Sequence, residues 1–240
     1  MAQALVPLKD LVRAKTRLAG LLAPSERRAL AQAMVEDVLA LLAIHPCVDS
    51  INLVSDDPSA HLLAAQYGAR HWPESELGCR GLNNIIGSAS RRLLALRDEP
   101  VLVLHADLPL LGPEDVSAVL AARQRTGGLV VGPDRHGKGT NILCFDAASV
   151  PAFCFGQDSC IRHLAAARAR GMAANVVNRP GIGLDVDEPQ DLAVLLSHLH
   201  SMACGRTLEL LRESGLGARI EVALGSLRSG EKPFDEHEVG

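Results

Sequence analysis

The chain has 240 residues, of which 48% are apolar and 22% charged, and its formal net charge at neutral pH is −4. This length fits one large domain or two small ones, at about 100–200 residues per domain. The mild acidity argues against a nucleic-acid-binding protein, which needs a basic surface. An aromatic content of 2% also leaves few rings on which bases could stack.

The sequence gives no sign of a membrane segment or an export signal. No apolar run approaches the ~20 residues of a membrane-spanning helix, and the first residues lack the basic and apolar regions of a secretory signal. None of the six cysteines forms the C-x-x-C pattern of many metal and redox sites. We therefore expect a cytoplasmic protein with no membrane partner and no nucleic-acid partner.

Strand and helix patterns alternate along the first two hundred residues. Leu30, Met34, Val38 and Leu41 recur at helical spacing, and residues 101–104 form an apolar run typical of a strand buried on both faces. We expect strands at 4–8, 51–54, 101–104, 129–131, 141–145, 175–177 and 184–186, and helices at 24–44, 59–67, 82–96, 113–123, 159–170 and after 187. This alternation predicts one α/β domain with helices on both faces of a mostly parallel, partly mixed sheet.

The pattern loosens after residue 200. We expect a helix at 207–213, a strand at 219–224 and a polar, mobile stretch at 226–240. The predicted organisation is a domain over residues 1–200 followed by a C-terminal extension over 201–240, partly ordered and flexible at its end.

Aspartates follow two predicted strands, where open α/β sheets bind ligands. Asp107 follows the apolar strand 101–104, and Asp185 and Asp187 alternate with apolar residues. Side chains two apart in a strand face the same way, about 6.5–7 Å apart at Cα, and two such carboxylates repel unless a cation neutralises them. These three aspartates predict a Mg²⁺ site for phosphate chemistry. Alternatively, Asp107 is a turn residue, Asp187 caps the following helix and Asp185 is solvated.

Three further segments could hold phosphate groups. Gly156 and Ser159 precede a predicted helix whose free amides attract anions, although helix capping alone needs only Ser159. Residues 133–141 contain two glycines around a lysine and then Thr140, which fits either a phosphate loop or a solvent hairpin. Residues 9–18 are basic and follow the first strand, which fits either a triphosphate-binding loop or a solvated helix face.

Taken in chain order, these motifs resemble one family. They are Val6-Pro7-Leu8-Lys9, Ala14-Lys15-Thr16-Arg17-Leu18, Gly81-Leu82-Asn83, Ala106-Asp107-Leu108-Pro109-Leu110, Pro133-Asp134-Arg135-His136-Gly137-x-Gly139-Thr140-Asn141, Phe155-Gly156-x-x-Ser159 and Leu184-Asp185-Val186-Asp187-x-Pro189-x-Asp191-Leu192. The ordered set, from about residue 4 to residue 197, resembles the guanylyltransferases of coenzyme F420 biosynthesis. Those enzymes are named for 2-phospho-L-lactate, phosphoenolpyruvate or 3-phospho-D-glycerate.

The resemblance implies a Rossmann-like nucleotidyltransferase fold and a homodimer. It implies GTP and a small phosphorylated carboxylic acid as substrates, with release of pyrophosphate. By position in the motifs, it assigns metal binding to Asp107, Asp185 and Asp187, acid binding to Thr140, Gly156 and Ser159, the guanosine side to Gly81, Leu82 and Asn83, and the triphosphate side to Lys9, Lys15 and Arg17. The sequence departs from the family pattern at His105, where proline is common, and at 77–80, where the family is commonly glycine-rich.

Two other functions fit parts of the sequence. A nucleotidyltransferase with another acceptor, such as a molybdopterin or a sugar phosphate, agrees with the predicted fold. Against it, the sequence lacks the usual glycine-rich loop after the first strand. A non-catalytic nucleotide-binding protein fits the basic segment but does not need three carboxylates at one edge of the sheet. No G-x-S-x-G sequence supports a hydrolase.

Overall fold

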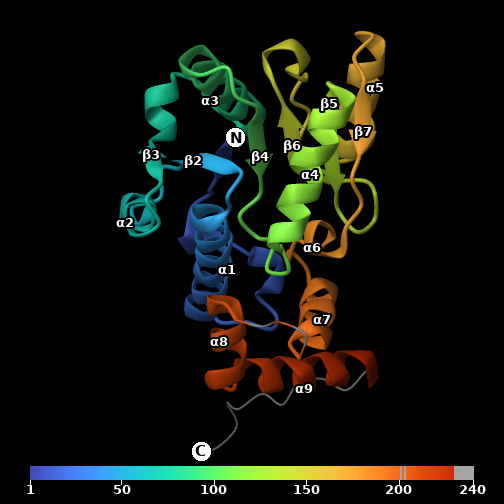
Figure 1. The fold of residues 1–240 in the computed structure, drawn as a ribbon. Coiled ribbons are helices and arrows are strands. Elements are labelled where there is room, and N and C mark those ends of the chain that lie inside the picture. Colours follow the sequence, from blue (N-terminus) through green and yellow to red (C-terminus); the bar gives the residue numbers. More distant parts are fainter. Residues whose placement is uncertain (201, 203, 230–240) are drawn as a thin grey trace, which may run out of the picture.

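The computed structural model describes residues 1–200, 202 and 204–229 and contains one seven-stranded sheet (Figure 1). The strand order is β3-β2-β1-β4-β6-β5-β7, and only β6 runs antiparallel to its neighbours. The mostly parallel, partly mixed sheet predicted from the sequence is therefore confirmed. The strands are β1 (Ala2–Pro7), β2 (Val48–Val54), β3 (Arg70–Trp72), β4 (Val101–Leu104), β5 (Leu129–Pro133), β6 (Thr140–Phe145) and β7 (Ala174–Val176).

Helices cover both faces of the sheet, as predicted. One face packs against α1, α2 and α4, and the other against α3 and α5. The helices are α1 (Pro24–Ile44), α2 (Ala60–Gln66), α3 (Leu82–Leu96), α4 (Pro113–Thr126), α5 (Ser159–Ala169), α6 (Pro180–Gly183), α7 (Pro189–His198), α8 (Arg206–Glu213) and α9 (Leu216–Ser229). Short 3₁₀ turns lie at η1 (Leu11–Arg13), η2 (Thr16–Leu18), η3 (Glu74–Leu77) and η4 (Ala147–Ser149).

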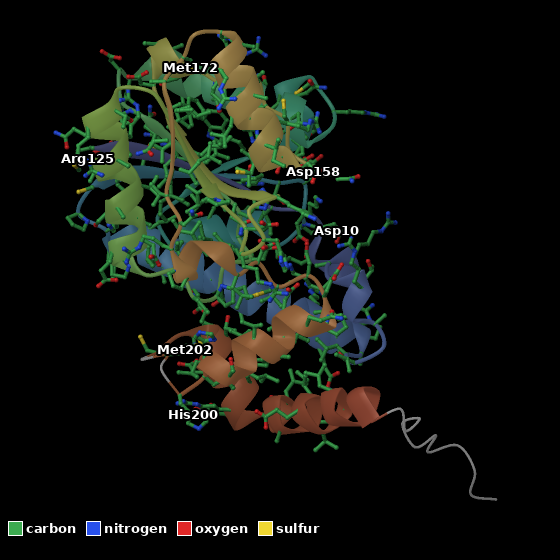
Figure 2. The ribbon with its side chains drawn as sticks, turned by 90° about the vertical axis from the view of Figure 1, so that its right-hand side faces the viewer. Asp10, Arg125, Asp158, Met172, His200 and Met202 are labelled. Atoms are coloured by element: carbon green, nitrogen blue, oxygen red, sulfur yellow. The ribbon has the colours of Figure 1, made fainter. Side chains whose placement is uncertain are left out.

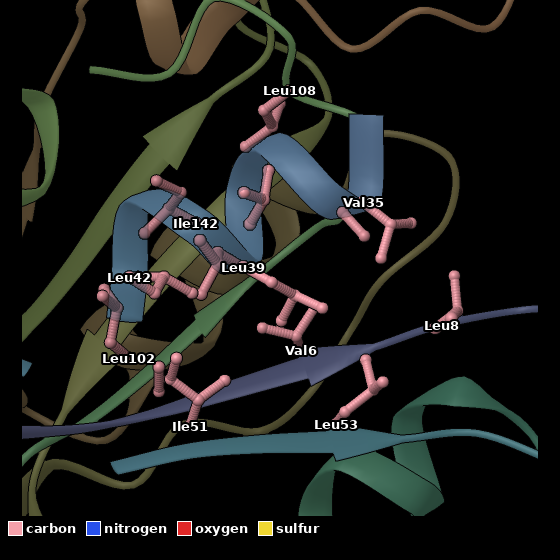
Figure 3. Close-up of a cluster of buried hydrophobic side chains, with 14 of the residues drawn as sticks. Val6, Leu8, Val35, Leu39, Leu42, Ile51, Leu53, Leu102, Leu108 and Ile142 are labelled. Carbon is pink, nitrogen blue, oxygen red and sulfur yellow. The ribbon is translucent and has the colours of Figure 1, made fainter. Parts of the chain in front are cut away.

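The core of the sheet is aliphatic. All four side chains of β4 are fully buried, which is why this strand has no polar face. Figure 3 shows Leu39 and Leu42 of α1 packed over Val6 of β1 and Leu102 of β4. At about 25 cal/mol per Å² of apolar surface buried, such contacts are the main source of stability.

A separate apolar cluster joins the C-terminal helices to the rest of the molecule. It combines Leu30 and Met34 of α1 with Leu192 of α7, Leu211 of α8 and Ile220 of α9, and these helices lie together at one end of the molecule in Figure 1. The predicted strand at 219–224 is wrong, because this segment lies within α9. The predicted division at residue 200 stays a prediction. Of the stretch 226–240 expected to be mobile, residues 226–229 belong to α9 and residues 230–240 lie outside the described residues.

The segment carrying two of the predicted site aspartates differs from the prediction. Residues 184–186 form no strand, although Leu184 and Val186 are buried and Asp185 and Asp187 less so, as the alternation predicted. Asp187 does not cap the next helix. The carboxylate of Asp191 instead accepts hydrogen bonds from the backbone N–H groups of Asp187 and of the N-cap residue, Glu188.

One edge of the sheet gathers the ends of the central strands. The carboxyl ends of β1 and β4 meet there because the two strands are parallel, and β6 begins there because it runs the opposite way. The loop after β1 folds into η1 and η2 rather than a continuous helix. Among the described helices, none is both long and apolar enough to span a membrane.

Candidate active site

A cleft of about 530 Å³ opens at this edge of the sheet. Its walls come from the loop after β1, the start of α3 and the segments after β4 and before α7. In Figure 2 the loop after β1, which carries Asp10, and the loop before α5, which carries Asp158, project from the same side of the molecule. The charged and polar side chains lining the cleft are Lys9, Asp10, Arg13, Lys15, Thr16, Arg17, His105, Asp107 and Asp187.

Lys15 lies at the centre of the charged groups. Its Nζ is 2.6 Å from Oδ2 of Asp107 and 2.9 Å from Oδ1 of Asp187, and its side chain is only 7% exposed. Burial disfavours the charged forms of both Lys15 and Asp107, but the attraction between the two charges is stronger than this penalty. The pKa of Lys15 is therefore raised and the pKa of Asp107 is lowered. Lys15 also has a left-handed backbone with φ of 55°, and such strain is common at functional sites.

Asp185 belongs to the same group of carboxylates. The backbone N–H of Val186 donates to the carbonyl oxygen of Asp107 at 3.3 Å, which joins the two segments. Oδ1 of Asp185 accepts a 3.2 Å hydrogen bond from the amide of Asn141. Burial, and then the negative charge of Asp107, raise the pKa of Asp185. The three predicted metal-binding aspartates therefore lie together, and Lys15 forms ion pairs with two of them, Asp107 and Asp187.

Two polar atoms near the cleft are buried without a hydrogen-bond partner among the described residues. They are Oδ1 of Asp107 and Nε2 of His105. An unpaired buried polar atom costs about 1–3 kcal/mol, so a ligand that pairs with either atom would gain from it. Across the described part of the chain, no three carboxylate, imidazole or thiol groups are arranged to hold a metal ion as they stand.

The other residues assigned to the nucleotide lie at the mouth of the cleft, with one exception. Lys9 and Gly81 are exposed, and Leu82 lines the cleft. Arg17 is also exposed and forms a 3.1 Å ion pair with Glu188.

Asn83 does not line the cleft, and its side-chain amide is already hydrogen-bonded to the backbone through both its oxygen and its nitrogen. Its Oδ1 accepts from the N–H of Phe155 at 2.7 Å and its Nδ2 donates to the carbonyl of the same residue at 3.3 Å. Asn83 thus holds the loop before α5.

The residues assigned to the phosphorylated acid lie on that loop and at the start of β6. Gly156 has φ of 115°, a conformation that side chains strongly disfavour. Ser159 is buried and is the first residue of α5, so the predicted capping position belongs to Asp158 instead. The hydroxyl of Thr140 lies 3.1 Å from Nδ1 of His163. These residues do not line the cleft, but the ring of His105, which does, contacts Phe155 with centroids 5.4 Å apart.

Residues 2–225 match the family model described as "Guanylyl transferase CofC like". The chain belongs to this guanylyltransferase family. It is 40% identical over 196 residues to the phosphoenolpyruvate guanylyltransferase of Conexibacter woesei, covering 80% of this chain and 86% of that one. It is 33% identical over 224 residues to the 2-phospho-L-lactate guanylyltransferase of Methanothermobacter thermautotrophicus, covering 92% and 97%.

Solved structures with low sequence identity share the fold of this family member. A putative nucleotide-diphospho-sugar transferase from Desulfovibrio desulfuricans aligns with a TM-score of 0.78 at 19% identity, over 92% of this chain and 97% of that one. A nucleotidyl transferase from Methanothermobacter aligns with a TM-score of 0.54 at 16% identity, over 84% and 99%. The family resemblance, the fold class and the assignment as a nucleotidyltransferase are confirmed.

Two residues at the site were not predicted as functional. Asn141 joins β6 to Asp185, and His163 joins β6 to the loop before α5. A signal for His163 was present, since it follows Ser159 by four residues and so shares its face of α5. Asn141 stood inside the quoted motif, but only the fold shows which way its side chain points.

Proposed function

We propose that this guanylyltransferase transfers GMP from GTP to a small phosphorylated carboxylic acid and releases pyrophosphate, in coenzyme F420 biosynthesis. The family membership and the printed names of its relatives support the reaction and the acceptor class. The observation that carries the proposal is the group of three aspartates, two of them paired with Lys15, beside a cleft with a basic wall. Two anionic substrates need such a site, because they repel each other.

The chemistry of these residues suits a bound Mg²⁺, although they are not arranged to hold one while Lys15 lies between them. Asp185 lies beside Asp107 and Asp187, which share one ammonium group, and one buried oxygen of Asp107 has no hydrogen-bond partner among the described residues. Hard divalent cations prefer such oxygen ligands. We assign the ion to Asp107, Asp185 and Asp187, where it would reduce the repulsion between the substrates and polarise the phosphoryl group. Lys15 lies between two of these ligands, so this assignment requires its ammonium group to move toward the nucleotide phosphates.

The proposed chemistry is an in-line displacement at the α-phosphorus of GTP. A phosphate oxygen of the acid forms a bond to this phosphorus, and the bond to the bridging oxygen of the β-phosphate breaks. A phosphate monoester is largely a dianion at pH 7, since its second pKa is about 6, so no general base is required. Lys9, Lys15 and Arg17 would neutralise the charge that develops on pyrophosphate.

The acceptor is proposed to lie against Thr140, Gly156 and Ser159. The positive φ of Gly156 and the positive end of the α5 dipole favour an anionic group there, although the first two amides of α5 already donate to the carbonyls of Gly156 and Lys138. His105 stands between this region and the cleft and has one unpartnered ring nitrogen. We propose that this nitrogen contributes to the choice among 3-phospho-D-glycerate, phosphoenolpyruvate and 2-phospho-L-lactate.

The test uses purified protein, GTP, Mg²⁺ and each of the three acids, with pyrophosphate release and product mass as readouts. We expect release with at least one acid and a product whose mass equals that of the acid plus GMP less water. CTP replaces GTP in the control reaction. Release with CTP or a sugar phosphate alone would favour a different nucleotidyltransferase, and nucleotide binding without release under any condition would favour a non-catalytic protein.

We also propose a homodimer, as the family resemblance suggests, and a cytoplasmic location, as the lack of an export pattern in the sequence suggests. Light scattering during size-exclusion chromatography measures the mass in solution. A monomer at the concentrations used for the activity assay would rule out the dimer as the active form.

A further inference from the structure

His163 is a fully buried residue of α5 whose ring joins two segments of the proposed acid site. Its Nδ1 lies 3.1 Å from Oγ1 of Thr140, the first residue of β6. Its Nε2 lies 2.9 Å from the backbone nitrogen of Cys154, two residues before Gly156. Both ring nitrogens are therefore engaged, and His163 can influence a ligand only through the groups that it holds.

The partners of His163 determine where its proton lies. A backbone N–H only donates, so Nε2 must accept from Cys154 with its lone pair. Burial, followed by the charge of Arg162, lowers the pKa of His163 to about 4, although the carbonyl of Ser159 opposes this. The ring is neutral at pH 7, and a neutral imidazole carries one proton, which must then be on Nδ1. Nδ1 therefore directs its proton to the hydroxyl oxygen of Thr140 at 3.1 Å, with the carbonyl of Ser159 as a second acceptor.

This direction of donation leaves the hydroxyl proton of Thr140 available. A threonine hydroxyl has one proton and two lone pairs, and His163 uses a lone pair. Among the described residues, no protein group accepts the proton. Its natural acceptor is an anionic oxygen, since hydrogen bonds to charged groups are stronger than those between neutral groups.

The start of β6 places Thr140 between the acid loop and the aspartates. The pairing of β5 with β6 shifts register between Gly132 and Pro133. The side chain of Thr140 reaches His163 on the α5 face, whereas the next residue, Asn141, reaches Asp185 on the other side. Thr140, which His163 contacts, is therefore the chain neighbour of Asn141, which contacts Asp185 of the proposed metal site.

Aromatic packing fixes the position of the His163 ring. Phe155 lies between two histidines, with ring centroids 5.0 Å from His163 and 5.4 Å from His105. The backbone of Phe155 is held in turn by the amide of Asn83. The ring of His163 thus has a packed neighbour as well as two hydrogen-bond partners.

We infer that His163 is a positioning residue for the phosphorylated acid. It holds the hydroxyl of Thr140 with its proton directed to an anionic oxygen of the acid, and it anchors the loop that carries Gly156. The inference rests on the proposed function for the identity of the ligand. The arrangement of His163, Thr140 and Cys154 does not depend on that function.

The kinetic test separates the two hydrogen bonds of His163. In His163→Gln the amide oxygen can replace Nε2 as the acceptor for Cys154, and in His163→Asn the amide nitrogen can replace Nδ1 as the donor to Thr140. We expect His163→Gln to raise KM for the acid about tenfold, the value of one hydrogen bond to a charged group, and KM for GTP less than about twofold. His163→Asn should raise KM for the acid less than His163→Gln does.

A double-mutant cycle tests whether His163 acts through Thr140. Thr140→Val removes the hydroxyl at nearly constant shape and should raise KM for the acid at least as much as His163→Gln, whereas Thr140→Ser should restore it. Adding His163→Gln to Thr140→Val should change KM no further. Additive effects, or an equal rise in KM for GTP, would show that His163 has only a structural role and would overturn the inference.

A spectroscopic measurement needs neither substrate nor variant activity. In ¹H–¹⁵N spectra of the imidazole groups of the wild-type protein, we expect the His163 proton on Nδ1, with His163→Asn providing the assignment. A proton on Nε2 would overturn the inference even if His163→Gln failed to fold. Because this spectrum is recorded without ligand, its result is independent of the pyrophosphate-release assay, which alone decides the proposed function.

Discussion

The ammonium nitrogen of Lys15 lies 2.6 Å from Oδ2 of Asp107, although 92 residues separate the two in the chain. The same nitrogen also reaches Asp187, across 172 residues. The loop after β1 can bring Lys15 this far into the cleft because the residue has a left-handed backbone between two 3₁₀ turns. The lysine thus acts as an internal counter-ion for carboxylates that would otherwise repel.

Lys15→Met should destabilise the protein and make it more responsive to Mg²⁺. Loss of the buried ammonium leaves Asp107 and Asp187 unpaired, which we expect to cost about 1–3 kcal/mol. A divalent cation then replaces the missing charge, so added Mg²⁺ should raise Tm more for this variant than for the wild type. Arg13→Met is the control, because Arg13 lines the same cleft but its side chain is 88% exposed. Equal Mg²⁺ responses of the two variants would contradict this role.

Asp185→Asn should abolish turnover and leave the fold intact. Burial and the charge of Asp107 already disfavour the Asp185 carboxylate, as its raised pKa indicates, so removing its charge should not lower Tm. We expect kcat to fall by about 100-fold or more if this carboxylate helps to neutralise transition-state charge. Asp98→Asn, at an exposed carboxylate outside the cleft, should keep wild-type activity. An active Asp185→Asn enzyme would remove this residue from the metal site.

Asn83→Ala should weaken acid binding, although the motif assigned this residue to the nucleotide. The substitution removes both hydrogen bonds to the backbone of Phe155, each worth about 0.5–1.5 kcal/mol. We expect a lower midpoint in urea and a rise in KM for the acid that exceeds the rise in KM for GTP. Asn84→Ala is a matched control, since the exposed side chain of Asn84 has one hydrogen bond among the described residues, to the carbonyl of nearby Arg80. A selective rise in KM for GTP would return Asn83 to the nucleotide side.

Stability should decrease in mild acid because of His163. Its pKa is about 4 in the folded protein and about 6.5 when unfolded, so the unfolded state binds more protons between these values. The contribution of His163 to the free energy of unfolding is complete above pH 6.5 and is lost as the pH falls toward 4. The loss amounts to up to about 3 kcal/mol, at ~1.4 kcal/mol per pKa unit. Urea unfolding across this range measures it. His163→Gln should flatten the dependence, whereas exposed His61→Gln should not.

Ile220→Ala should destabilise the protein far more than Val222→Ala. Ile220 is fully buried in the cluster of α1, α7, α8 and α9, and Val222 is 71% exposed. Truncation of a buried isoleucine costs about 2–5 kcal/mol, and truncation of an exposed valine costs little. In a strand, residues two apart would share one face and both would be buried or exposed. Similar losses of stability from the two variants would therefore favour the strand that the sequence pattern predicted.

The sequence predicted the central elements because their burial is unambiguous. Residues 101–104 are apolar throughout and form β4 with those bounds, and the expected helix at 82–96 coincides with α3. Residues 184–186 alternate like a strand, but they lie beside Asp107 as an irregular segment. Periodicity reports which side chains are buried, and it does not report whether the backbone has a neighbouring strand with which to pair.

The sequence by itself determined the order of the motifs, the α/β sheet and the set of charged residues available to the site. Only the tertiary structure decided the partners within that set: Lys15 between two aspartates, Asn83 on Phe155, and His163 on Thr140. The physical reason is that strand and helix patterns are local, whereas hydrogen bonds and ion pairs depend on distances of a few ångströms between distant segments. Those distances follow from the strand order and from the path of each loop.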